Sequence, residues 1–351
     1  MSAVREGKLP DYMIRKATAG VAGFSDAENI SAYCAACAQL ILHAAEDAAL
    51  PIHRAMNLLY EQGRKPYGIT VTALLPQKIS ERAIKCLMRS IAAAAGAHSA
   101  RIMDYNLSVS GEAENIWLSV SAYGEEAAER ELRKESPKKN EFEGEKAEGG
   151  ILSSETEQEP AGIRYLVQTR FAGMAGSLLL SRDLRDELRT RYTDEFLDGC
   201  RIFAENLSIR DDVRIAGELS AEYVSEAYEG GIFGALWELG EACGSGMEIW
   251  LPEILLRQET IEICEHFDIS PYQLFSGGCA LIVTTRPQEL KAALEAGQIP
   301  ASIIGKLTDG NDRIVCNQGE IRYLEPVRLD EYRKVTASKN SAAGREAGML
   351  L

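Results

Sequence analysis

The stretch Gly230–Thr284 reads GGIFGALWELGEACGSGMEIWLPEILLRQETIEICEHFDISPYQLFSGGCALIVT, and its pattern of helices and strands indicates the fold class. Paired glycines open an apolar helical pattern that continues through Glu241. The pattern then predicts a strand at Met247–Leu251, a helix at Gln258–Phe267 and a strand at Cys279–Thr285. Helices and strands that alternate in this way predict an α/β or α+β domain, in which helices cover a sheet.

Similar patterns flank this stretch on both sides. Toward the C-terminus we expect a helix at Gln288–Glu295 and short strands near Ser302–Leu307 and Arg313–Cys316. Toward the N-terminus we expect a strand at Ile163–Thr169 and helices near Ala172–Leu188 and Thr193–Asn206. The expected second domain therefore spans residues 163–335, and a flexible tail follows at 336–351.

The N-terminal part of the chain also mixes helices and strands. Ile69 and Val71 alternate with threonines, which predicts a strand at Tyr67–Leu75. Ser80 is a suitable N-cap for an amphipathic helix that ends near Gly96. The other expected elements are an Ala-rich helix at Ser31–Ala49 and strands near Ala100–Val109 and Asn115–Tyr123. We expect these elements to form a first domain, residues 1–123.

A charged segment separates the two expected domains. Residues 124–162 contain twelve glutamates and six lysines or arginines, with Phe142 as the only aromatic residue. Such a composition cannot bury enough apolar surface to offset the entropy of ordering, so we expect a flexible acidic linker. A docking segment for a basic partner is the alternative interpretation of the same charge.

Composition limits the classes of function. The 351 residues carry 53 acidic and 38 basic side chains, a formal charge of −15. This balance argues against binding to nucleic acid or to an anionic membrane, both of which need clustered Lys and Arg. No stretch approaches the ~20 consecutive apolar residues of a membrane span. The first twenty residues carry charges and no apolar core of a signal peptide, so we expect a cytoplasmic protein with reduced thiols.

Local motifs for metal, redox or nucleophilic chemistry are weak. Cys34 and Cys37 form a C-x-x-C pair within the Ala-rich run, without a second pair to complete a tetrahedral zinc site. We therefore favour small core residues over a metal or redox site at this pair. His266 falls at the end of an expected helix, where a positive charge is favourable, and no nucleophile signature lies near it. We predict no catalytic residue and no metal ligand.

Two glycine pairs offer the better candidates for a binding site. Gly230 and Gly231 open a helix, and exposed N–H groups at a helix start suit phosphate. Gly277 and Gly278, just before the expected strand at Cys279, form a similar but weaker pattern. Neither pair belongs to a dinucleotide fingerprint or a P-loop. Tight turns and close packing are the equal alternative, because glycine permits both.

The second expected domain resembles the C-terminal domain of the aminoimidazole ribonucleotide (AIR) synthase-like superfamily, which includes hydrogenase-maturation carbamoyl dehydratases, selenophosphate synthetases and thiamine-monophosphate kinases. The resemblance covers about Ile163–Pro326 and is greatest to the hydrogenase-maturation branch. It rests on the paired glycines, Glu238 and Glu241, Pro252, Arg257–Thr260, Asp268–Pro271, Ser276–Gly278, Ile303–Gly305, Asp309–Ile314 and Tyr323–Pro326. The resemblance implies two α/β domains, the first of which pairs its strands with a second subunit. We therefore expect a homodimer through residues about 55–123.

The first expected domain departs from the family pattern. Asn57 matches the Asn of the family's Asn-Asp pair, but Leu58 stands in place of the Asp. The family's Gly-Gly-His-Thr-Glu segment would fall near Asp104 without matching it. In the second expected domain, where the family writes His-Asp before its glycines, this chain keeps only an acid at Glu226. Family members bind ATP through Mg²⁺, which needs carboxylate ligands, so these losses are expected to be severe.

We therefore expect a degenerate, non-catalytic member of the superfamily, without a cofactor, that binds or regulates a protein partner or a paralogue. The hydrogenase-maturation reaction also needs a C-terminal cysteine, whereas the last cysteine here is Cys316 and the sequence ends at Leu351. Two alternatives stay open. One is a scaffold that uses the acidic linker. The other is an ATP- and Mg²⁺-dependent enzyme with a rebuilt site in the domain cleft, for which the candidate residues are Asn57, Asp104, Glu226, Gly230, Gly231, Gly277 and Gly278.

Overall fold

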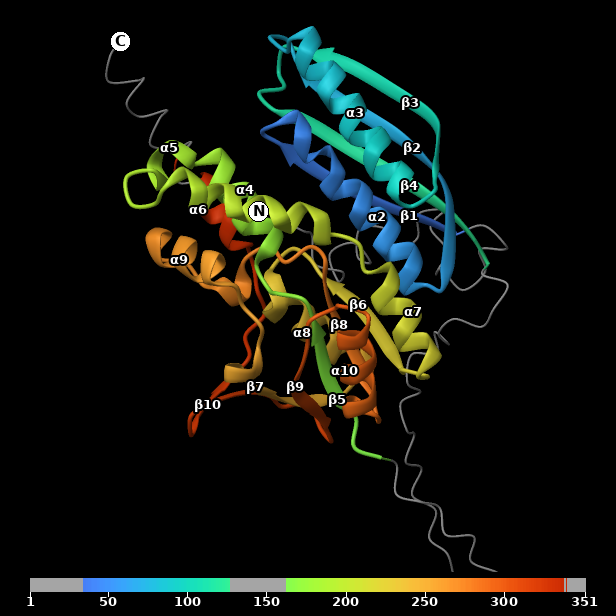
Figure 1. The fold of residues 1–351 in the computed structure, drawn as a ribbon, viewed down its shortest axis with the longest axis vertical. Helices are drawn as coiled ribbons and strands as arrows, with labels where there is room; N and C mark the ends of the chain where they lie inside the picture. The colour runs from blue at the N-terminus through green and yellow to red at the C-terminus, as the bar shows by residue number, and fades with distance from the viewer. Residues whose placement is uncertain (1–33, 127–161, 338, 340–351) are drawn as a thin grey trace, which may run out of the picture.

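A computed structural model describes residues 34–126, 162–337 and 339 of the chain. Figure 1 shows an N-terminal sheet with two helices stacked on a larger C-terminal sheet with its own helices. The mixed α/β architecture agrees with the expected fold class. None of the helices in the described ranges is long and apolar enough to cross a membrane. Residues 127–161, most of the expected acidic linker, lie outside the described residues, as does the end of the tail.

The N-terminal part forms a four-stranded sheet in the order β1-β4-β2-β3. Strand β2 is parallel to β3 and antiparallel to β4, which is antiparallel to β1. The elements are β1 Cys34–Leu42, η2 Ala45–Ala48, α2 Ala49–Glu61, β2 Arg64–Pro76, α3 Glu81–Ala97, β3 Arg101–Ser110 and β4 Ile116–Glu126.

Helices α2 and α3 cover only one face of this sheet. Leu59 of α2 and Leu87 of α3 are fully buried, as are the inward residues Ile69 and Val120 of the strands. On the opposite face Trp117 is 53% exposed. Strand β3 is an edge strand whose residues are exposed along most of its length. Among residues 34–126 and 162–337, no helix or strand covers the outer face of this sheet or its β3 edge.

The Ala-rich helix predicted at Ser31–Ala49 is wrong. The chain forms strand β1 at Cys34–Leu42 instead and pairs with β4 over its whole length. From Ala36 to Leu42 the even-numbered residues are buried, so the buried positions have the period of a strand. Cys37 is exposed and contacts Ser121, so the interpretation of this cysteine as a core residue is also wrong. Tertiary pairing has overridden the high helix propensity of alanine.

The C-terminal part contains a seven-stranded sheet in the order β11-β10-β7-β9-β5-β8-β6, in which only β10 and β7 run parallel. Its elements are β5 Tyr165–Thr169, α4 Met174–Asp183, α5 Arg185–Leu188, α6 Asp194–Gly199, η3 Cys200–Asn206, α7 Arg210–Glu218, β6 Tyr223–Ala227, α8 Gly231–Cys243, β7 Gly246–Trp250, η4 Leu251–Glu253, α9 Gln258–Phe267, η5 Pro271–Gln273, β8 Cys279–Thr284, α10 Pro287–Ala296, β9 Ala301–Thr308, β10 Arg313–Asn317 and β11 Glu320–Tyr323. Residues 331–337 are also helical.

Helices cover this sheet from both sides. Leu236 of α8 packs with Leu281 and Met247 on one face. Leu294 of α10 belongs to the same core as Ile282 on the other face, where α10 contacts mainly β9 and β5. Strand β8 is therefore buried along both faces, which explains its uninterrupted apolar sequence.

Most of the predicted elements are confirmed within about two residues. Ser80 caps α3 by accepting a hydrogen bond from the Ala83 N–H, as expected. The helix predicted to start at the paired glycines is α8, and α9 has the predicted bounds. Elements that were not predicted are α2, α7, β6, β11, the short η2, η4 and η5, and the helix at 331–337.

Candidate functional site

The N-terminus of α8 is the first candidate for an anion site. Gly230 and Gly231 both have positive φ, of 82° and 66°. A Cβ on Gly231 would lie 2.5 Å from the Tyr272 carbonyl oxygen, so only glycine fits there. The turn presents the Gly230 N–H at the start of the helix, where the helix dipole favours a negative charge.

A carboxylate of the same chain already occupies this position. Asp330 accepts hydrogen bonds from the Gly230 N–H at 2.7 Å, the Tyr332 N–H at 2.9 Å and the Phe275 N–H at 3.3 Å. Its side chain is buried, and burial raises its pKa to about 7 although these N–H donors favour the charged form. The site that was predicted to suit phosphate therefore holds Asp330, a residue that the sequence analysis did not single out.

The segment around Asp330 is anchored to both parts of the molecule. The Tyr332 hydroxyl donates to Asp183 at the end of α4 at 2.8 Å, and its ring lies edge-on to His43 after β1. Arg333 pairs with Glu229 beside the paired glycines. These contacts fix residues 328–337, which we call the C-terminal segment, across the junction between the two sheets.

Glu226 belongs to a second buried network at this junction. Its Oε1 accepts the Gly278 N–H at 2.7 Å, and its Oε2 pairs with Arg54 of α2 at 2.9 Å. Arg54 also pairs with Glu61 at 3.1 Å, and Glu61 accepts the Glu226 N–H at 2.9 Å. Burial raises the pKa of Glu226, while Arg54 and the Gly278 N–H oppose the shift. Burial alone would lower the pKa of Arg54, but the two carboxylates outweigh it and raise the value.

Asn57 is a third buried link across the junction. Its Nδ2 donates to the Leu207 carbonyl at 2.8 Å, and its Oδ1 accepts the Ile209 N–H at 3.1 Å. Both partners lie between η3 and α7, and the Asn57 side chain is fully buried. The side-chain amide therefore holds α2 against the C-terminal part of the chain. Leu58, its neighbour, packs partly buried against the core.

The second glycine pair serves close backbone packing. Gly278 has a φ of 88°, and a Cβ there would lie 2.2 Å from the Asn206 carbonyl oxygen. A Cβ on Gly277 would contact Ala175 at 3.4 Å. The Gly278 carbonyl accepts from Arg170 at 3.2 Å, so both backbone groups of this glycine have partners within the protein.

The remaining candidates lie elsewhere. Asp104 is exposed on β3 and accepts its neighbour's N–H, from Tyr105, at 2.8 Å. His266 ends α9 and lies 3.9 Å from Glu187. Five candidates, Glu226, Gly230, Gly231, Gly277 and Gly278, thus gather around the turns that flank β6 and β8, Asn57 joins the same junction, and Asp104 does not.

The junction leaves little open space beside its buried groups. Across residues 34–126 and 162–337, no group of three or more His, Cys, Asp or Glu side chains could hold a metal ion. The hollow beside the C-terminal segment, between His43 and Arg333, has a volume of about 180 Å³. Ligand pockets usually measure about 300–1,000 Å³. The junction is therefore filled by the protein's own side chains.

Sequence reasoning missed the partners of the candidate residues. Arg54, Asn57 and Glu61 recur at helical spacing on α2, and a polar stripe on a helix with buried apolar residues could have indicated a buried network. Asp330 had no such pattern, because it meets Gly230 from a hundred positions away.

Comparisons with known proteins agree with this fold. Residues 229–317 match the family model "AIR synthase related protein, C-terminal domain". The phosphoribosylformylglycinamidine synthase subunit PurL of Methanothermobacter thermautotrophicus is 26% identical over 157 residues, which is 43% of this chain but only 20% of PurL. The structure of HypE from E. coli has a TM-score of 0.69 at 15% identity, covering 91% of this chain and 97% of HypE. Thiamine monophosphate kinase from Aquifex aeolicus has a TM-score of 0.60 at 15% identity, covering 88% and 96%.

Proposed function

We propose that this chain, which has the AIR synthase-like fold and an AIR synthase related C-terminal domain, does not use ATP and acts by binding protein chains, including a second copy of itself. One observation carries the proposal. The carboxylate of Asp330 holds the N-terminus of α8, where a phosphate would otherwise find the N–H groups and the helix dipole. A phosphate at that position would compete with the Asp330 side chain for the same N–H groups.

The other junction contacts support the same conclusion. The only acid kept near the family's His-Asp position, Glu226, is 1% exposed and neutralised by Arg54. Freeing it for Mg²⁺ would leave the Arg54 guanidinium buried beside Glu61 alone. Both polar atoms of the Asn57 side-chain amide are also used. These groups stabilise the contact between the two sheets, and each is engaged by partners from the same chain.

The homodimer rests on the open sheet of the N-terminal part. Strand β3 is an edge strand with Tyr105 60% and Val109 58% exposed, and Trp117 is exposed on the outer face. An uncovered apolar edge is a template for pairing with another strand. Light scattering at micromolar concentration should give the mass of a dimer, and Val109→Lys on the edge should shift it toward the monomer. A monomer mass for the unmodified chain would remove the dimer from the proposal.

A measurement of ATP hydrolysis tests the proposal that the chain is not an enzyme. The purified chain with ATP and Mg²⁺ should release no phosphate above the protein-free background, and Glu226→Gln should change nothing. Mg²⁺-dependent phosphate release that Glu226→Gln abolishes would refute the proposal. That result would support the second candidate, an ATP-dependent enzyme whose C-terminal segment moves away from α8. The observation that favours this candidate is the hollow lined by Glu229, Asp330 and Arg333.

A further inference from the structure

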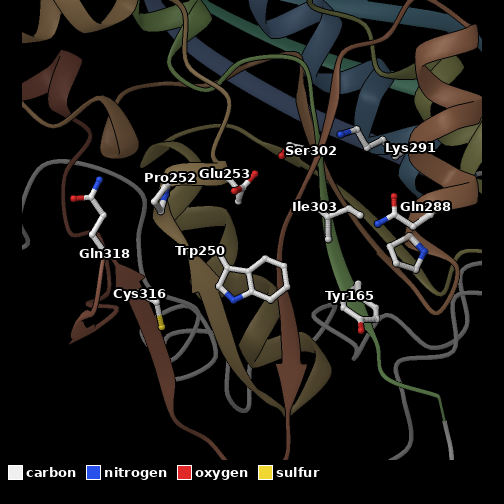
Figure 2. Close-up of a pocket in the computed structure, with 11 residues that line it drawn as sticks. Tyr165, Trp250, Pro252, Glu253, Gln288, Lys291, Ser302, Ile303, Cys316 and Gln318 are labelled. Carbon is white, nitrogen blue, oxygen red and sulfur yellow. The ribbon is translucent and has the colours of Figure 1, made fainter.

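A second hollow lies on the C-terminal sheet and takes no part in the junction. It is a groove of about 660 Å³, lined mainly by strands β5, β7, β9 and β10 and bordered by η4 and the first turns of α10. Figure 2 shows Trp250 in its middle, between Tyr165 on one side and Cys316 on the other. We call it the Trp250 groove. Its volume is in the range of about 300–1,000 Å³ that small-molecule sites have.

The indole ring in this groove is held in place by its edge. The Trp250 Nε1–H donates to Glu248 at 2.9 Å, two residues earlier on the same face of β7. Glu248 also pairs with Lys306 at 3.2 Å, directly opposite on β9. These two hydrogen bonds lower the pKa of Glu248. The carboxylate therefore stays charged and continues to accept the hydrogen bond from the indole N–H. A ring fixed in this way loses little entropy when a flat ligand stacks on it.

Charged groups border the aromatic floor. Lys291 of α10 lies on one wall, 38% exposed, with its ion-pair partner Glu295 at a long distance of 3.8 Å. Glu253 of η4 contributes a carboxylate to another part of the wall, as Figure 2 shows. An ammonium group suits an anionic arm, and a carboxylate suits the N–H donors of a heteroaromatic ring. The groove thus offers complementary charges around a stacking surface.

We infer that the Trp250 groove binds a planar heteroaromatic molecule with an anionic arm, the ring stacking on Trp250 and the anion contacting Lys291. The groove and the α8 N-terminus lie on different elements, since α8 packs against the face of the sheet formed by Leu281 and Met247. Binding in the groove therefore needs no change at Asp330. The inference stands whether or not the junction uses ATP.

Flavin mononucleotide and adenosine monophosphate are suitable probes, because each joins a planar ring to a phosphate. Titration of the full chain, followed by calorimetry and by quenching of flavin fluorescence, should give saturable binding of at least one of them. Riboflavin or adenosine, without the phosphate, should bind about three- to tenfold more weakly. Ribose 5-phosphate, without the ring, should give no heat. If neither nucleotide binds at about 1 mM, or if ribose 5-phosphate binds equally well, the inference is overturned.

Variants locate the binding. Trp250→Ala should weaken the interaction about tenfold or more, the loss expected when a stacked ring is removed. Trp250→Phe keeps an aromatic ring and should retain most of the affinity, which shows that the loss in Trp250→Ala does not come from unfolding. Lys291→Gln should weaken it about threefold to tenfold and reduce its dependence on salt. Lys85→Gln, at an exposed lysine of the N-terminal part, is the matched control for Lys291→Gln and should leave the affinity unchanged. Binding that survives Trp250→Ala in a folded protein would place the ligand elsewhere.

Discussion

The junction between the two sheets and the Trp250 groove differ in what their polar side chains contact. At the junction, Glu226, Asn57 and the α8 N-terminus are each satisfied by partners from the same chain. In the groove, Lys291 and Glu253 border an open aromatic surface. A buried polar group that has its hydrogen bonds stabilises the fold, whereas a half-exposed one can exchange water for a ligand.

Under the two proposals above, the ligand-binding site lies away from the residues that resemble family motifs. The junction carries the residues that resemble family motifs, yet their chemistry is used for packing. The groove carries no such motif and has the larger open volume. Function follows from the groups that are left free to act, and not from the fold that holds them.

The largest effect is expected from the buried ion pair of the junction. Arg54→Met removes the cation that neutralises Glu226 and Glu61, and should lower the free energy of unfolding by about 3–5 kcal/mol. Urea unfolding measures the change. Arg214→Met, which breaks an exposed pair with Glu218, is the control and should change stability by no more than about 0.5 kcal/mol. Equal losses in the two variants would contradict a structural role for the junction network.

Removal of the Asp330 carboxylate should have the next largest effect. Asp330→Ala leaves the N–H groups of Gly230 and Tyr332 without their acceptor, and should lower stability by about 2–3 kcal/mol. Asp104→Ala, at an exposed carboxylate on β3, should change it by less than about 0.5 kcal/mol. A stable Asp330→Ala protein that gains Mg²⁺-dependent ATP binding would show that this carboxylate is what excludes the nucleotide.

The pH dependence of stability should come partly from the junction. Burial raises the pKa of Asp330 and of Asp47 from 3.8 to about 7, although Arg182 opposes the shift at Asp47. The native state therefore binds protons more tightly than the unfolded state, so this stability is complete below pH 3.8 and is lost as the pH rises through about 7. The Tm should fall between pH 5.5 and pH 8, and less steeply in Asp330→Asn. An unchanged slope in that variant, relative to Asp104→Asn, would exclude Asp330 as a source.

The smallest effects on stability are expected in the groove. Lys291→Gln should leave the free energy of unfolding within about 0.5 kcal/mol of the unmodified value, because its ion pair is long and exposed. The same variant should weaken nucleotide binding there. A large loss of stability would mean that Lys291 is part of the packing, and the contrast with the junction would weaken.

The sequence predicts local elements well where the local pattern and the packing agree. Ser80 and the apolar stripe after it define α3 without help from the rest of the chain, and the apolar run of β8 defines a buried strand. At Cys34–Leu42 the alanine content favoured a helix, but the segment is a strand because it pairs with β4. That pairing joins residues about eighty positions apart, which no local pattern reports.

The contacts of the candidate site residues also cannot be predicted from local sequence patterns. Glu226 and Asn57 were recognised as important because they keep the residue type of a motif. Their chemistry depends on Arg54 and on the Leu207 carbonyl, 172 and 150 positions away. Asp330 joins Gly230 across 100 positions. Whether a polar residue faces a ligand or a partner in its own chain is settled by these long-range contacts.

Calorimetric titration with ATP, with and without Mg²⁺, would show whether the junction binds a nucleotide. It should be done on the Trp250→Ala protein, so that any binding in the groove does not contribute. We predict no heat of binding up to about 1 mM ATP in either condition. Mg²⁺-dependent binding that is lost in Glu226→Gln would contradict the account, because it would show that the junction opens to a nucleotide.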